Sequence, residues 1–185
     1  MKIIETRLPG VCIIEPKVYG DSRGYFLESY HEERYMQAGI QGRFVQDNHS
    51  RSSKGTLRGL HYQRQKPQGK LVRITQGEVF DVVVDIRCDS PFFGKWVGVN
   101  LSGENYRQLW VPPGFVHGFC VLTDTADFLY KCTEYYYPED EGAVAWNDPN
   151  IGIEWPIEEP LLSKKDSAAP RLNDIPKDKL PRYTV

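Results

Sequence analysis

The sequence predicts a mainly β protein, a jelly-roll β-barrel with a few short helices and an irregular C-terminal tail. Short segments alternate between apolar and polar residues, which is typical of half-buried strands. Glycine, proline, asparagine or aspartate separates most of these segments, and 16 glycines and 13 prolines fit a turn-rich chain. A chain of 185 residues is long enough to bury its own core, so we expect a single domain over residues 1–185.

Strands are expected through most of the chain, and the clearest one covers residues 80–87. There the even-numbered apolar residues share one face, while Asp81 and Asp85 share the other face with Val83 as an exception. Roughly ten strands of this length and spacing favour a jelly roll or a related barrel. The other strands are expected over residues 11–15, 24–30, 43–48, 56–63, 70–76, 95–101, 106–112, 115–122 and 126–133.

Helices are expected only as short pieces. Residues 31–38 are predicted to form one, with Gly39 as its C-terminal cap. A second helical turn is expected near residues 163–168. From about Asn147 onward, recurring prolines predict the irregular tail.

Charge and composition exclude several classes of protein. The formal net charge of −2 gives no electrostatic case for binding nucleic acid or a membrane surface. The N-terminus is charged too early to be a signal peptide, and no apolar run approaches membrane-spanning length. The four cysteines form no C-x-x-C pair and are expected to be reduced thiols. We therefore expect a cytoplasmic protein.

Two histidine motifs resemble the signature of the cupin barrel. They are Gly-x5-His, which ends at His61, and Pro-x-Gly-x-x-His, which ends at His117. A metal-binding cupin would carry a second histidine at the position of Gln63. We therefore expect no metal site and a His61 that is free for proton chemistry, with a metal-dependent cupin enzyme as a remote alternative.

The surroundings of His61 decide between a base and a hydrogen-bonded core histidine. Alternation places Gly59, His61 and Gln63 on one strand face, which leaves Arg58 on the other. A bulge at Gly59 would bring Arg58 to the side of His61. Polar neighbours favour the base, and they are Lys70, Gln46, Asp47, Asn48 and His49.

Other candidate residues have a structural and a functional interpretation. Tyr130 is either a core aromatic or an acid whose hydroxyl projects into a cavity. Asp166 is either a solvated carboxylate or the partner that fixes an imidazole tautomer. At least one of the three tyrosines at residues 135–137 should be exposed, where its ring would suit a planar base or a partner surface. The same ambiguity holds for Arg23, Glu28 and Glu141.

Several segments together closely resemble the family of dTDP-4-dehydrorhamnose 3,5-epimerases, which act in dTDP-L-rhamnose synthesis. The resemblance runs in order from about residue 10 to residue 170. The segments are GDSRGYF (20–26), FVQDNHS (44–50), LRGLHYQ (57–63), KLV (70–72), GEVFD (77–81), PGFVHGF (113–119), YKC (130–132) and IGIEWP (151–156).

The resemblance implies an isomerase that converts dTDP-4-dehydro-6-deoxy-D-glucose to dTDP-4-dehydro-L-rhamnose without a cofactor or metal. The 4-keto group makes the hydrogens on C3 and C5 acidic, so a base on one face of the ring and an acid on the other suffice. His61 resembles the family's base, Asp166 its orienting partner and Tyr130 its acid. Lys70 is the candidate cation that stabilises the enolate.

The family pattern also implies contacts with the rest of the substrate and a homodimer. Tyr136 resembles the ring that stacks on thymine, and an early strand at residues 11–15 would reach the partner subunit. The residues placed around the sugar and diphosphate are Arg23, Glu28, Gln46, Asp47, Asn48, Arg58, Lys70, His117, Glu141 and Lys165.

Two alternatives stay open at this point. An epimerase that acts at only one carbon, C3 or C5, of a related dTDP-4-keto-deoxysugar would use the same base and acid. A non-catalytic sugar-nucleotide binding module would keep the substrate contacts but would have no use for the acid–base pair.

Overall fold

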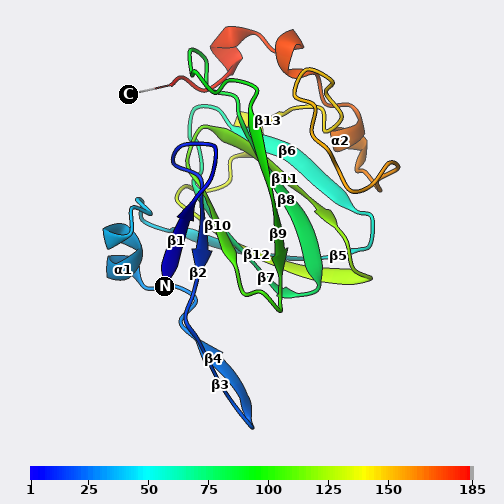
Figure 1. Cartoon of the computed structure of the whole chain (residues 1–185). Coiled ribbons are helices and arrows are strands. Elements are labelled where there is room, and N and C mark those ends of the chain that lie inside the picture. Colours follow the sequence, from blue (N-terminus) through cyan, green and yellow to red (C-terminus); the bar gives the residue numbers. More distant parts are fainter. Residues whose placement is uncertain (184–185) are drawn as a thin grey trace.

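A computed structural model describes residues 1–183 as two antiparallel β-sheets that face each other, with the C-terminal tail lying over one of them (Figure 1). The predicted jelly-roll architecture is confirmed, although the two sheets stay separate instead of closing into a barrel. The larger sheet has the order β1 (Lys2–Glu5), β2 (Cys12–Glu15), β10 (Gln108–Val111), β7 (Lys70–Gln76), β12 (Thr125–Cys132) and β5 (Gln46–Ser53). The smaller sheet has the order β13 (Glu141–Ala143), β6 (Leu57–Gln63), β11 (Phe115–Val121), β8 (Glu78–Asp85) and β9 (Trp96–Ser102).

All the predicted strands form, with shifted ends, but three short strands were not predicted. These are β1, β13 and β3 (Val18–Asp21), which pairs with β4 (Gly24–Leu27). Each has only three or four residues, too few for alternation to be distinctive.

The expected helices are confirmed as α1 (Glu32–Gln37) and α2 (Lys164–Ser167). Gly39 caps α1 as predicted: it has a φ of 88°, its N–H bonds to the Met36 carbonyl, and the Ile40 N–H bonds to the Tyr35 carbonyl. Besides α2, the described part of the tail has two short 3-10 turns, at Leu172–Asp174 and Lys177–Lys179, and a third turn lies at Pro138–Asp140. None of the helices in residues 1–183 is long and apolar enough to cross a membrane.

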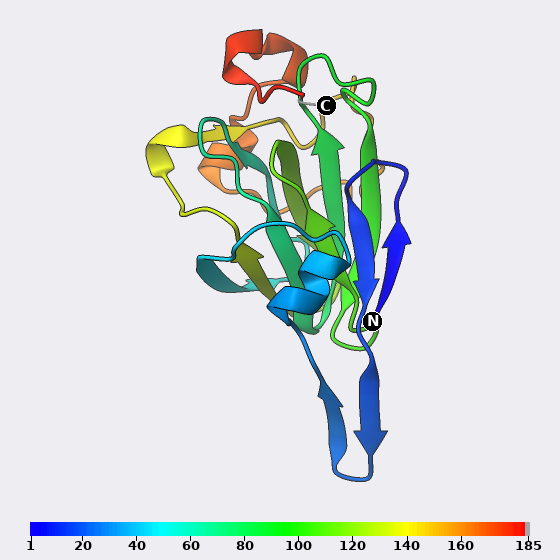
Figure 2. The same ribbon diagram turned by 90° about the vertical axis from the view of Figure 1, so that its left-hand side faces the viewer.

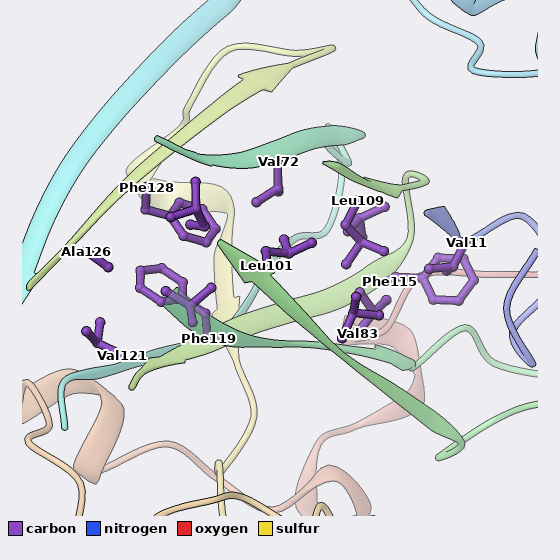
Figure 3. Close-up of a cluster of buried hydrophobic side chains, with 14 of the residues drawn as sticks. Val11, Val72, Val83, Leu101, Leu109, Phe115, Phe119, Val121, Ala126 and Phe128 are labelled. Atoms are coloured by element: carbon purple, nitrogen blue, oxygen red, sulfur yellow. The ribbon is translucent and has the colours of Figure 1, made fainter. Parts of the chain in front are cut away.

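The main core lies between the two sheets, and both contribute to it (Figure 3). Val72 and Phe128 from the larger sheet meet Val83, Leu101 and Phe119 from the smaller one. The rings of Phe119 and Phe128 stack with centroids 3.9 Å apart, which contributes about 1 kcal/mol beyond their burial. This stack ties the sheets together directly beside the cavity described below.

The tail covers the outer face of the smaller sheet, which changes the interpretation of residues 80–87. Val82 and Val84 pack against Leu172 and Leu180 of the tail, not against the opposite sheet. The alternate face, which carries the two aspartates, therefore points between the sheets together with Val83. Both faces of β8 are buried over residues 81–85. An apolar Val83 on the otherwise polar face is the feature of the sequence that agrees with this burial.

The β3–β4 hairpin projects away from the two sheets (Figure 2). It carries three large aromatic side chains that are more than half exposed, Tyr19, Tyr25 and Phe26. The segment predicted to reach a partner, residues 11–15, behaves differently, because β2 is paired on both edges within its own chain, with β1 and β10. The hairpin, and not β2, is the extended arm of this chain.

Candidate active site

A cavity of about 550 Å³ lies between the two sheets, and the tail forms part of its wall. One side comes from β6 and β11, and the other from β7 and β12. The tail closes a third side with residues 161–166, which are held there because Leu161 exchanges backbone hydrogen bonds with Gly55 and Leu57. Seven of the predicted site residues line this cavity: Arg58, His61, Lys70, His117, Tyr130, Lys165 and Asp166.

A bulge in β6 brings Arg58 and His61 to the same side, as the sequence suggested. Against β11, His61 pairs with His117 and Arg58 pairs with Phe119, so three steps of one strand oppose two of the other. Gly59 has a φ of 128°, and a Cβ atom there would lie 2.6 Å from the Cα of Gly118. Only glycine fits this position.

His61 and Asp166 form a close pair at the edge of the cavity. Nε2 of His61 lies 2.6 Å from Oδ1 of Asp166, and the side chains are 26% and 4% exposed. The carboxylate holds the imidazole proton on Nε2, which leaves Nδ1 as the unprotonated nitrogen. An imidazole held in this way can accept a proton at Nδ1.

Asp166 is held in place by the start of α2. Ser163 caps this short helix, since its hydroxyl accepts a hydrogen bond of 3.1 Å from the Asp166 N–H. Burial, the largest single effect, would raise the pKa of Asp166, but the hydrogen bond and charge of His61, together with Ser163 and Lys165, hold the pKa below its usual value. The carboxylate therefore stays ionised and can stabilise an imidazolium.

Tyr130 and Lys70 lie on the opposite sheet from His61. Burial raises the pKa of Tyr130 to about 12, so its hydroxyl keeps its proton and can donate it. Burial lowers the pKa of Lys70, although the nearby Cys132 and Glu141 oppose that shift. The cavity thus has a histidine on one wall and a protonated tyrosine and a buried lysine on the other.

A second histidine–carboxylate pair, between His117 and Asp81, was not predicted from the sequence. Nε2 of His117 lies 2.8 Å from Oδ1 of Asp81, and both side chains are buried. Burial raises the pKa of Asp81, and its Oδ2 has no hydrogen-bond partner among the described residues. Alternation placed Asp81 on the polar face of this strand but did not show that this face points between the sheets.

Another group of predicted residues forms a connected rim. The Tyr136 hydroxyl donates a hydrogen bond of 2.9 Å to Glu141, which is also paired with Lys165. Oε1 of Gln46 accepts a 2.9 Å hydrogen bond from the Tyr136 N–H, and Nε2 of Gln46 donates to Asn48. Since Lys165 also lines the cavity, the rim is continuous with it.

Three predicted residues are not brought to this cavity within one chain. Asp47 is paired at 3.0 Å with Lys131 and lines a separate hollow on the outer side of the larger sheet. Arg23 lies in the turn of the projecting hairpin, paired with Asp21, and Glu28 follows that hairpin. Alternation along β5 explains Asp47, because its neighbours Gln46 and Asn48 point to the other side.

The described residues show no obvious metal centre. Within residues 1–183, no group of three or more histidine, cysteine, aspartate or glutamate side chains is arranged to hold a metal ion. Gln63 lies on the His61 side of β6 but does not line the cavity, because its amide is bound to the segment that carries Tyr136.

Comparison with known sequences gives consistent matches. A family profile described as dTDP-4-dehydrorhamnose 3,5-epimerase matches residues 5–174. The chain is 59% identical over 176 residues to the enzyme of that name from Salmonella typhimurium, covering 94% of this chain and 96% of the relative. It is 52% identical over 183 residues to the one from Escherichia coli, covering 97% and 99%.

The solved structures that resemble this chain include both a 3,5-epimerase and a 3'-monoepimerase. A dTDP-6-deoxy-D-glucose-3,5-epimerase from Legionella pneumophila, in complex with dTDP-4-keto-L-rhamnose, has a TM-score of 0.97 and 59% identity, covering 100% of this chain and 99% of that one. A 3'-monoepimerase from Streptomyces bikiniensis, in complex with dTDP-quinovose, has a TM-score of 0.91 and 37% identity, covering 96% and 92%. The chain is thus more similar to the double epimerase of this pair.

Proposed function

The chain belongs to the dTDP-4-dehydrorhamnose 3,5-epimerase family, and from that premise we propose how its own residues carry out the reaction. The enzyme is an isomerase that inverts C3 and C5 of dTDP-4-dehydro-6-deoxy-D-glucose to give dTDP-4-dehydro-L-rhamnose. The observation that carries the residue assignment is the His61–Asp166 pair, which lies across the cavity from Tyr130.

In this proposal His61 is the base. Nδ1 accepts the proton from C3 or C5, and the positive charge that develops on the ring is stabilised by Asp166. The electrons left on carbon delocalise onto the C4 oxygen as an enolate. Lys70, whose ammonium is buried beside the cavity, stabilises that oxygen anion.

Tyr130 is the acid that completes each inversion. It lies on β12 of the larger sheet, whereas His61 lies on β6 of the smaller sheet, so a sugar ring between them meets the two groups on opposite faces. Return of a proton from the face opposite its removal inverts the carbon. The remaining cavity and rim residues, Gln46, Asn48, Arg58, His117, Tyr136, Glu141 and Lys165, are proposed to bind the substrate.

Exchange with deuterated water tests both the reaction and the number of carbons that the enzyme epimerises. Incubation of the substrate with the enzyme in D2O should introduce deuterium at both C3 and C5, because each returned proton comes from an exchangeable group. Mass spectrometry and NMR of the product locate the label. Deuterium at one carbon only would show a monoepimerase instead.

We further propose a homodimer in which the β3–β4 hairpin completes the partner's site. Its exposed aromatic residues provide an apolar docking surface, and its turn carries Arg23, a guanidinium suited to diphosphate oxygens. Glu28 follows the same arm. A second copy of the chain would explain why these predicted binding residues lie outside their own cavity.

Two measurements test this dimer. Sedimentation at micromolar concentration should show a dimer, and a monomer would refute the proposal. Co-refolding inactive Arg23→Ala and His61→Ala chains in equal amounts should restore about a quarter of the wild-type activity, because each mixed dimer contains one complete site. Activity that stays at the level of the separate variants would place Arg23 outside the partner's site.

A cytoplasmic location is part of the same proposal. All four cysteines are buried free thiols, which fits a reducing compartment. Cell fractionation with an activity assay checks it, and activity confined to the membrane fraction would contradict it.

A further inference from the structure

The segment that carries Tyr136 lies between two strands without being part of either. Strand β12 ends at Cys132 and β13 begins at Glu141. In the described chain, residues 134–136 make no hydrogen bond to another backbone group. The Tyr136 hydroxyl bonds to Glu141, but side-chain contacts must hold the backbone from which the ring projects.

Gln63 bonds to this backbone on both sides of Tyr136, while Gln68 donates to the Glu134 carbonyl. Gln63 is the last residue of β6 and its side chain is only 4% exposed. Its Nε2 donates hydrogen bonds of 2.8 Å and 3.0 Å to the carbonyls of Lys66 and Tyr135, and its Oε1 accepts one of 2.8 Å from the Tyr137 N–H. One amide thus holds the backbone on both sides of Tyr136.

Gln46, the first residue of β5 in the larger sheet, also bonds to the backbone of Tyr136. Its Oε1 accepts the Tyr136 N–H at 2.9 Å. The Tyr136 side chain itself stays 48% exposed. The backbone is therefore fixed from both sheets while the ring remains available to a ligand.

Only an amide can make the contacts seen at position 63. The site presents two carbonyl acceptors and one N–H donor, which a glutamine matches with two donors and one acceptor. A carboxylate has no donor and would place negative charge against two carbonyl oxygens. A neutral histidine has one donor and one acceptor, so at least one carbonyl would lose its partner.

We propose that Gln63 is a positioning residue that sets the Tyr136 ring for the nucleobase of the dTDP-sugar. This inference rests on the proposed role of Tyr136. It separates two functions along one strand: His61 performs proton transfer, and Gln63, two residues later, builds the nucleotide end of the site. The side chain at the position where a cupin metal site has a histidine thus contributes to substrate binding.

The test compares nucleotide binding with turnover in Gln63→Glu, which keeps the size of the side chain but removes both donors. We expect the dissociation constant for dTDP and the KM to rise about tenfold or more, because a ring whose backbone is no longer held in place loses stacking contact with the base. The kcat at saturating substrate should change less than about threefold, since the acid–base pair is untouched. Gln65→Glu makes the same charge change at a neighbouring exposed glutamine and should leave both quantities unchanged.

A second variant and a double-mutant cycle make the result decisive. Gln63→Met removes all three hydrogen bonds without burying a charge, and it replaces Gln63→Glu if thermal denaturation shows that the latter does not fold. In a Tyr136→Ala background, Gln63→Met should weaken dTDP binding less than about twofold further. Full additivity of the two effects, or a fall in kcat with unchanged dTDP binding, would overturn the inference. If Tyr136→Ala alone leaves dTDP binding unchanged, the proposed role of Tyr136 fails instead.

Discussion

The cavity contains two histidine–carboxylate pairs that differ chiefly in access. His61 and His117 are directly paired across β6 and β11, and each has a carboxylate within 2.8 Å of its Nε2. The side chain of His61 is 26% exposed, whereas that of His117 is 7% exposed. Since the chemical pairing is the same, the environment decides which imidazole can meet a substrate carbon and act as a base.

The origin of the two carboxylates differs as well. Asp81 lies on β8, the strand next to β11, so its pair is built within one sheet. Asp166 comes from the tail, 105 residues away from His61 along the chain. The pair built within the sheet, His117 with Asp81, is buried. His61, whose partner comes from the tail, stays partly exposed. The predictions below test this difference.

The largest effect is expected for the two histidines themselves. His61→Ala should lower kcat by about a thousandfold or more, because positioned proton transfer is lost, while dTDP still binds. Steady-state kinetics and calorimetric titration with dTDP measure the two quantities. His117→Ala should act mainly through KM and stability. An equal loss of kcat in both variants would remove the distinction between the pairs, and substantial turnover by His61→Ala would exclude His61 as the base.

The carboxylates should differ in the same direction with a smaller effect. Asp166→Asn should lower kcat by about a hundredfold, because an amide no longer stabilises the imidazolium and permits the wrong tautomer. Asp81→Asn should lower kcat less than about tenfold. Both are measured at saturating substrate, with melting temperatures as a control for folding. The reverse order of the two losses would assign the base to His117.

Stability should show the opposite asymmetry. His117→Ala leaves Asp81 buried without its partner and should lower the free energy of unfolding by about 3 kcal/mol at neutral pH. The pKa of Asp81, already raised by burial, rises further without His117, so the folded chain binds the proton more tightly than the unfolded chain. The deficit should therefore shrink as the pH falls from 7 to 5. Urea denaturation at both pH values, with wild type alongside, checks this, and a constant deficit would contradict it.

The smallest effect concerns the alkaline limb of the pH profile. The pKa of Lys70 is lowered from its model-compound value of 10.5, whereas that of Tyr130 is raised to about 12. Activity should therefore decline with an apparent pKa below 10.5, as Lys70 loses its proton first. In Lys70→Arg the residual activity should decline only at a higher pH, because the guanidinium stays charged. An unchanged limb would show that Lys70 is not the titrating group.

Much of this arrangement could be predicted from the sequence, and the remainder has a common physical cause. Alternation predicted the strands, and the glycine at position 59 suggested the bulge that turns Arg58 towards His61. Asp81 was missed because alternation reports that a strand has two different faces but not what covers each one. The cover on β8 is the tail, which is distant in sequence.

The side-chain roles at the rim were harder to predict for a related reason. The three hydrogen bonds of Gln63 all go to backbone groups, and two of them reach residues 135–137, about seventy positions later. Such contacts leave no local pattern. Asp47 shows the converse, since it adjoins Gln46 and Asn48 in the sequence, yet a strand sends neighbouring side chains to opposite sides.

The attachment of the tail has a consequence for the order in which the enzyme becomes active. Leu161 bonds to the backbone at the start of β6, five residues before Asp166, and both are translated after every strand of the two sheets. A nascent chain can therefore assemble its β-sheets while its histidine still lacks an orienting carboxylate. The His61–Asp166 pair can therefore form only after synthesis has passed residue 166. A chain truncated before Asp166 would keep every strand of the two sheets but would present His61 without its carboxylate partner.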